Sequence, residues 1–203
     1  DWSGADFIAP YTGETPTNYS IEFDFRIESV TAGFVFGGVD TSHFLMWQVS
    51  SYNYGTNTAD WKMTVRPHVW NGNVTCITEI DISNIISIEN AYKTHKMKLE
   101  IKGNTVYTYI DGVKLDWTYT SDYASFGKIG FREVSNGTAY SEAAFFDNIF
   151  ITDDNSGTVI YSNNFNENAE PFTSGSLING ELRQQDNYVT TLWDIVPKEK
   201  TGT

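Results

Sequence analysis

The chain has 203 residues, of which 15% are aromatic and only 19% are charged, a composition that is typical of strands and turns in one all-β domain. Its formal net charge of −13 argues against nucleic acid and anionic membranes as partners, because such partners bind through Lys and Arg. We expect a single domain over residues 1–196, followed by a linker or tail over residues 197–203, which have no apolar face.

The first segments of the chain differ in character. Residues 1–8, DWSGADFI, are too short for an element and too aromatic for a random tail, so we expect them to dock on the body or to join a preceding domain. From Tyr19 onward, apolar residues alternate with charged ones through Ile21, Phe23 and Ile27. This period of two predicts a strand with one buried face.

Residues 33–49, GFVFGGVDTSHFLMWQV, set two apolar runs on either side of a small polar insert. Apolar runs bounded by turn residues predict a β-hairpin. Its tip would carry Asp40, Thr41 and His43, whose oxygen and nitrogen atoms suit a sugar or an oxygen-bound metal. Trp47 and Gln48 follow on the returning strand and join Asp40 as candidate sugar ligands.

The rest of the chain continues as short strands. Asn71-Gly72 favours a tight hairpin between strands over 61–70 and 73–81, and residues 83–92 form a short helix or an irregular crossover. Further strands are predicted over 96–102, 105–110, 114–119, 128–133, 143–152, 158–161 and 176–184. About ten to twelve short strands with almost no helical periodicity predict an all-β, two-sheet antiparallel sandwich or jelly roll.

The lone cysteine, Cys76, cannot form an internal disulfide. It lies in the alternating run 74–80, so we expect it to be a packing residue.

A second group of candidate ligands lies in the strand around Pro67. Arg66, His68 and Trp70 share parity and can therefore share one face of a strand. Pro67 has no N–H to donate, which indicates an edge or a bulge, where a strand can turn a side chain toward a ligand.

Arg132 follows a run in which Ile129 and Phe131 would point inward, so its side chain would face the other surface of its sheet. That surface suits a binding face in a curved sandwich. An ion pair between Arg132 and Glu142 is the structural alternative.

Signals for catalysis are weak. Glu22 and Asp24 share a strand face, as the two carboxylates of a jelly-roll glucanase do, but Arg26 follows them and a solvated face is the favoured interpretation. No Gly-x-Ser-x-Gly element is present, and the histidines lack the spacing of zinc ligands.

The order of several short motifs resembles that of concanavalin A-like, laminin G-like jelly rolls. More narrowly, the chain resembles the non-catalytic carbohydrate-binding domain (carbohydrate-binding module family 67) of bacterial alpha-L-rhamnosidases of glycoside hydrolase family 78. The motifs are Ala32 to Gly37 leading to Asp40, Met46-Trp47-Gln48, Arg66-Pro67-His68, Thr108 to Gly112, Gly127 to Arg132, Phe146 to Ile149, Val159 to Phe165, Pro171-Phe172 and the opening residues 1–8.

This resemblance implies a non-catalytic chain that binds terminal L-rhamnose or a related plant-glycan sugar with the help of calcium. Asp40 matches the position of an Asp that contacts both metal and sugar, and Thr41 stands where the family has Asn. The catalytic acids would lie on a separate helical barrel domain of an extracellular or periplasmic parent enzyme. The expected sugar-binding set is Asp40, Thr41, Trp47, Gln48, Arg66, His68 and Arg132, with Asp40 also as the metal ligand. A glucanase-type hydrolase and an interdomain scaffold that has lost its sugar are the alternatives.

Overall fold

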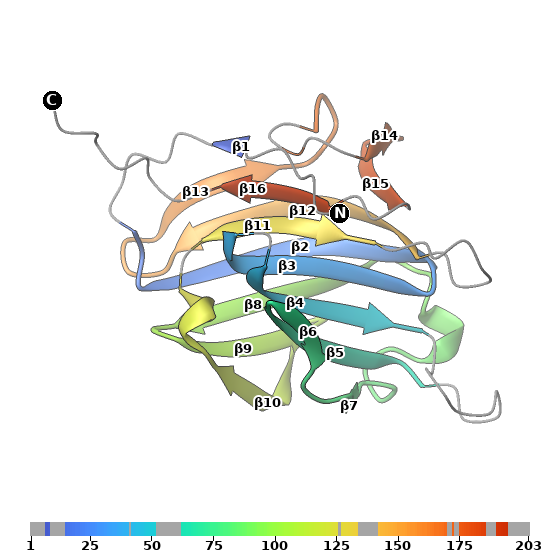
Figure 1. Cartoon of the computed structure of the whole chain (residues 1–203). Helices are drawn as coiled ribbons and strands as arrows, with labels where there is room; N and C mark the ends of the chain where they lie inside the picture. Colours follow the sequence, from blue (N-terminus) through green and yellow to red (C-terminus); the bar gives the residue numbers. More distant parts are fainter. Residues whose placement is uncertain are drawn as a thin grey trace, which may run out of the picture.

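Two β-sheets lie face to face and form the body of the protein (Figure 1). The computed structural model describes residues 7–8, 15–40, 42–51, 62–125, 127–133, 142–169, 172, 175–185 and 190–194. The first sheet runs in the order β1 (Phe7–Ile8), β16 (Thr190–Asp194), β11 (Lys128–Arg132), β3 (Thr31–Asp40), β4 (His43–Ser50), β5 (Thr64–Asn71) and β6 (Asn73–Cys76), with β7 (Ile80–Asp81) also paired to β5. The second runs in the order β10 (Val113–Thr120), β9 (Thr105–Ile110), β8 (His95–Lys102), β2 (Asn18–Ser29), β12 (Ala143–Asp153), β15 (Glu181–Gln185) and β14 (Ser176–Ile178), with β13 (Thr158–Asn163) also paired to β12.

This architecture confirms the predicted two-sheet antiparallel sandwich. Among the described residues, β1 with β16 is the one parallel pair, and every other pair is antiparallel. Helical structure in the same residues consists of two 3₁₀ turns, η2 (Ile88–Asn90) and η3 (Asp122–Ala124). No helix in the described ranges is long and apolar enough to cross a membrane.

The predicted strands are found, with three differences. The segment predicted as one strand over 73–81 is two short strands, β6 and β7, separated by residues 77–79. The segment predicted as one strand over 176–184 is the hairpin β14–β15, because Asn179 and Gly180 adopt positive φ and turn the chain. In the opening segment, Phe7 and Ile8 pair with the unpredicted strand β16, and residues 1–6 lie outside the described residues. Residues 197–203, expected to form a tail, lie outside the described residues.

The core fills the space between the sheets. From β2, the alternate residues Ile21, Phe23 and Ile27 are at most 1% exposed, as the period of two predicted. They meet inward side chains of the first sheet, with the Phe23 and Phe34 ring centroids 4.5 Å apart. This burial of apolar surface is the main favourable contribution to folding.

One buried hydrogen bond ties the two sheets together. The indole Nε1 of Trp47, on β4, donates to the hydroxyl of Thr108, on β9, at 2.9 Å. Both side chains are fully buried, and Phe36 and Trp117 surround the indole at centroid distances of 4.8 Å and 5.9 Å. A buried indole N–H needs such an acceptor, because an unsatisfied donor in the core is costly.

We therefore expect Thr108→Val to lower the free energy of unfolding by about 1–3 kcal/mol, since it leaves the Trp47 N–H buried without its acceptor. Denaturant unfolding followed by fluorescence measures the change. The matched control is Thr118→Val on the neighbouring strand β10, where the side chain is exposed and the expected change is within about 0.5 kcal/mol. Equal effects of the two substitutions would show that the cross-sheet bond contributes nothing.

Candidate functional site

The outer face of the first sheet, the side that points away from the core, collects four of the predicted ligands. Strand register sets Gln48 of β4 opposite Arg66 of β5, and Met46 opposite His68 two residues away. The neighbouring residues on β4 and β5 point into the core. The outer face therefore carries Gln48, Met46, Arg66 and His68. Arg132 of β11 reaches the same face and approaches Met46.

Apolar and aromatic side chains form the floor of this face. Val35, Phe44 and Met46 make a small cluster, all at most 1% exposed, and Trp70 packs against it. The Phe44 and Trp70 rings stack at a centroid distance of 5.0 Å. A floor of this kind offers an aromatic surface to a ligand that has an apolar side.

The Arg132 guanidinium lies over this floor. Its Cζ atom is 5.4 Å from the centre of the Trp70 ring, and its Nη1 atom is 3.8 Å from the Met46 sulfur. A cation above an indole face is held by cation–π attraction. The floor therefore positions a planar set of N–H donors next to an aromatic ring.

His68 is a buried polar group with one open hydrogen-bonding position. Its side chain belongs to a residue that is 7% exposed, and its Nδ1 is 2.8 Å from the carbonyl oxygen of Arg66. Because a carbonyl only accepts, Nδ1 carries the hydrogen and a neutral ring leaves Nε2 as an acceptor. No hydrogen-bond partner of Nε2 is found among the described residues.

Burial keeps this histidine neutral. Loss of solvation and the positive charges of Arg66 and Arg132 lower the pKa of His68 to about 4, although the bond to the Arg66 carbonyl opposes the shift. At neutral pH the ring therefore presents an acceptor beside two cationic side chains. Such buried unpaired groups are uncommon in proteins and mark sites for a ligand or a water molecule.

Two acidic residues, Glu142 and Glu133, bond to Gln48 of β4 and to the Thr31 end of β3. Gln48 Nε2 donates to Glu142 at 3.4 Å, while Glu133 accepts from the Gly33 amide at 2.9 Å and from the Thr31 hydroxyl at 3.3 Å. Burial, together with the nearby charge of Glu142, raises the pKa of Glu133 well above its ordinary value. Burial thus opposes the charged form of Glu133.

Gly33 allows β11 to approach β3 closely at this point. A Cβ atom on Gly33 would lie 2.3 Å from the carbonyl oxygen of Arg132, so a side chain there would push β11 away. The glycine in the run Gly33-Phe34-Val35 is therefore a packing requirement of the strand that carries Arg132.

Two other predicted ligands, Trp47 and Asp40, lie elsewhere. Trp47 points inward and is fully buried between the sheets, so its indole does not form part of the outer face. Asp40 lies at the hairpin end of β3, where its carboxylate bonds to His43 Nδ1 at 2.8 Å and to the Ser42 amide at 2.7 Å. These bonds lower the pKa of Asp40. Thr41 lies outside the described residues.

The described residues around Asp40 do not fit a calcium ion by themselves. Calcium takes six to eight oxygen ligands, whereas the one carboxylate at this turn already bonds to His43 and Ser42. Within the part of the chain that the structure describes, no group of three or more His, Cys, Asp or Glu side chains could hold a metal. The calcium site stays a prediction.

Glu22 and Asp24, the pair considered for hydrolysis, lie on the opposite side of the molecule, on the outer face of the second sheet. Both carboxylates bond to the Lys96 ammonium at 3.0 Å, and Asp24 also accepts from Asn148 at 2.9 Å. A shared counter-ion on a partly exposed strand face is what the solvated-face interpretation predicts.

The floor residues Phe44 and Met46 were not assigned to the outer face from the sequence. Phe44 and Met46 have the same parity as Gln48, so alternation along β4 could have assigned them to the outer face. Cys76 is a clear correction, because it is exposed instead of packed. It lies on the short strand β6, all four residues of which are exposed at the edge of the sheet.

No protein-family profile matches the chain, and no curated protein sequence matches it. Three solved structures are similar in part. The carbohydrate-binding module CBM66 from Bacillus subtilis is 16% identical, with 68% of this chain and 77% of that chain covered and a TM-score of 0.48. Sheep galectin-11 in complex with glycerol is 7% identical, with coverages of 60% and 92% and a TM-score of 0.38. The homodimeric agglutinin CG-16 from chicken liver is 13% identical, with coverages of 58% and 83% and a TM-score of 0.39. At these values the ligand of the present chain has to be inferred from its own residues.

The pKa of His68 provides a direct test of the described site. Its value of about 4 in the folded chain lies below the 6.5 of a free histidine, so the unfolded chain binds more protons between these pH values. The free energy of unfolding should therefore fall by up to about 3 kcal/mol as the pH is lowered through this window. NMR titration should show the His68 ring titrating near pH 4.

The matched variant is His68→Asn, which can still donate to the Arg66 carbonyl and does not titrate. Between pH 7 and pH 4.5, the free energy of unfolding should fall less in His68→Asn than in the unsubstituted protein. The difference between the two proteins removes the contribution of Glu133, whose raised pKa acts in the opposite direction. A His68 ring that titrates near pH 6.5 would contradict the buried, neutral state.

Proposed function

We propose that the outer face of the first sheet binds a neutral sugar and that the chain is a non-catalytic carbohydrate-binding domain. The main support is the open Nε2 acceptor of His68, which lies beside cationic Arg66 and Arg132. Neighbouring hydroxyls of a sugar ring are both donors and acceptors, so one can donate to the imidazole while another accepts from a guanidinium.

The floor beneath these groups fits the apolar side of the same ligand. Trp70, stacked on Phe44, offers an aromatic surface next to the polar groups. L-rhamnose carries a methyl group in addition to its hydroxyls, so the partly buried Trp70 ring could contact that methyl group while His68 and Arg132 bind the hydroxyls. Terminal L-rhamnose is therefore our first candidate, with an alpha-L-rhamnosidase as the parent enzyme and an extracellular or periplasmic location.

Titration calorimetry with L-rhamnose and a panel of plant-glycan sugars tests this function. Arg132→Ala should weaken binding about 10- to 100-fold, since a hydrogen bond from a charged donor contributes about 1.5–3 kcal/mol. Arg183→Ala is the control, because Arg183 bonds to Glu28 on the outer face of the second sheet. No heat with any sugar would favour the scaffold alternative, and an unaffected Arg132→Ala protein would remove this face from the binding site.

The same titration tests calcium. If Asp40 holds a calcium ion that assists binding, then chelation by EDTA should weaken sugar binding, and Asp40→Asn should weaken it to a similar extent in the presence of calcium. Equal affinities with calcium and with EDTA would reject the metal and leave the sugar site unaffected.

A further inference from the structure

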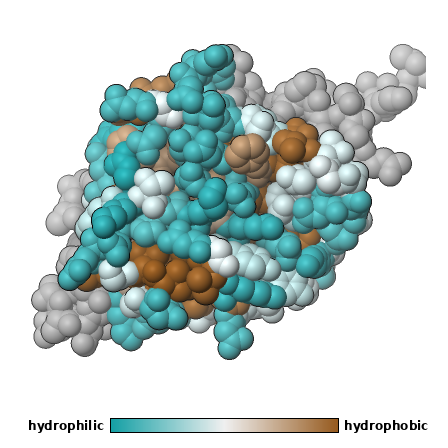
Figure 2. All heavy atoms as spheres, turned by 180° about the vertical axis from the view of Figure 1, so that it is seen from behind, coloured by the Kyte–Doolittle hydropathy of each residue, from teal (hydrophilic) through white to brown (hydrophobic). Residues whose placement is uncertain are grey.

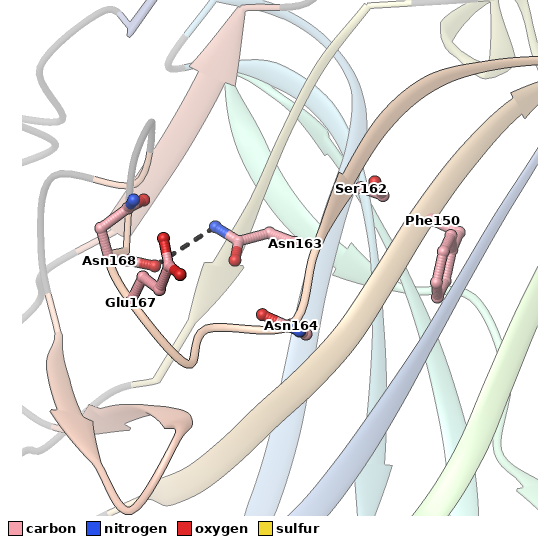
Figure 3. A pocket seen from close by; sticks show the side chains of 6 residues that line it. All are labelled: Phe150, Ser162, Asn163, Asn164, Glu167 and Asn168. Carbon is pink, nitrogen blue, oxygen red and sulfur yellow. Dashed lines mark hydrogen bonds between the residues drawn. The ribbon is translucent and has the colours of Figure 1, made fainter.

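A cavity of about 270 Å³ lies away from the outer face of the first sheet, where β12, β13 and the segment after β13 meet (Figure 3). It is lined by Phe150, Ser162, Asn163, Asn164, Glu167 and Asn168. In the view of Figure 3, Asn163 and Asn164 lie between Phe150 and the segment that carries Glu167 and Asn168. The sequence offered no motif for this site.

The cavity lies on the outer face of the second sheet. Ile149 and Ile151 are fully buried in the core, so Phe150 between them points outward, and it is 44% exposed. Register on β12 sets Phe150 opposite Glu22 on one side and opposite Ser162 on the other. The cavity and the site around Arg132 therefore lie on opposite sides of the sandwich. Figure 2 shows the molecule from behind as mostly hydrophilic, with separate hydrophobic patches.

The segment that lines the cavity is held by its own hydrogen bonds. Asn163 Nδ2 donates to the Tyr161 hydroxyl at 3.1 Å and to the Asn168 carbonyl at 3.3 Å, while its Oδ1 accepts from the Phe165 amide at 2.7 Å. Phe165 adopts a φ of 51° and places its ring, fully buried, in the core. Such a segment needs little reordering when a ligand binds, which lowers the entropic cost of binding.

Three polar groups on the cavity wall have no hydrogen-bond partner within the described ranges. They are the Ser162 hydroxyl, the Asn164 Nδ2 group and the Glu167 carboxylate, whereas Asn164 Oδ1 is engaged by the Asn166 amide at 3.3 Å. The Asn164 Nδ2 group donates, the Glu167 carboxylate accepts and the Ser162 hydroxyl can do both. Together with the exposed ring of Phe150, they form a polar wall beside an aromatic surface.

We infer that this cavity is a second carbohydrate-binding site, separate from the one proposed around Arg132 and independent of it. The Phe150 ring packs against the apolar side of a sugar ring, while Asn164 donates to one hydroxyl and Glu167 accepts from its neighbour. The Glu167 carboxylate and the net charge of −13 favour neutral over acidic sugars. The volume lies just below that of sites for drug-sized ligands, which fits one sugar ring or the end of a glycan.

Residue-resolved NMR titration of the 203-residue chain tests this site, because it separates the two faces within one sample. The probes are glucose, galactose, mannose, xylose and L-rhamnose, each titrated to millimolar concentrations. At least one sugar should shift the amide signals of Ser162, Asn164 and Glu167. Phe150→Ala and Glu167→Gln should each weaken that response at least about 10-fold, as loss of a stacking ring or a charged acceptor predicts.

The matched control is Val159→Ala, which changes an exposed apolar residue on the same strand as Ser162 but outside the cavity, and it should keep the response. Arg132→Ala should also keep the response. A result that rejects the site around Arg132 can therefore be told apart from one that rejects the cavity. The second site is rejected if no sugar shifts these signals, or if the shifts persist in Phe150→Ala protein whose spectrum shows an intact fold.

Discussion

The burial of β3 and β4 on both of their faces is the constraint on which the rest of the structure depends. Phe34 and Trp47 point into the core, while Val35 and Met46 point to the outer face, and all four are at most 1% exposed. Strands covered on one side only would leave the polar residues of the neighbouring strands in water. Here His68 is 7% exposed, so its contact with the Arg66 carbonyl forms in a medium of lower dielectric constant than water.

This environment changes the proton affinities of the buried polar groups on the outer face. Loss of solvation favours a neutral His68 imidazole and raises the pKa of Glu133, while the Arg132 guanidinium lies over the Trp70 indole. In water the same side chains would be solvated and would contribute little. If the outer face binds the proposed sugar, its specificity depends on which hydroxyls can meet these donors and acceptors.

Much of the fold and part of the site could be predicted because strands have a period of two. Arg66 and His68 were assigned to one face by parity alone, and the register confirms it. Trp47 was misplaced because it ends the run Phe44 to Trp47, in which every residue is apolar, so parity cannot show which face each occupies. Asp40 has the right chemistry for a ligand, but in the turn its oxygens bond to local donors, as Asp side chains often do. The β1–β16 pair joins the two ends of the chain, and no local pattern could indicate it.

The exposed thiol of Cys76 gives the outer face a natural attachment point. It is the only cysteine in the chain, and register sets it directly across from His68, at the roughly 5 Å spacing of paired strands. A polarity-sensitive fluorophore coupled to this thiol would be attached at one defined position beside the buried imidazole, without any substitution. The cysteine that was expected to be a packing residue thus makes the native chain suitable for an optical sensor of any ligand at this face.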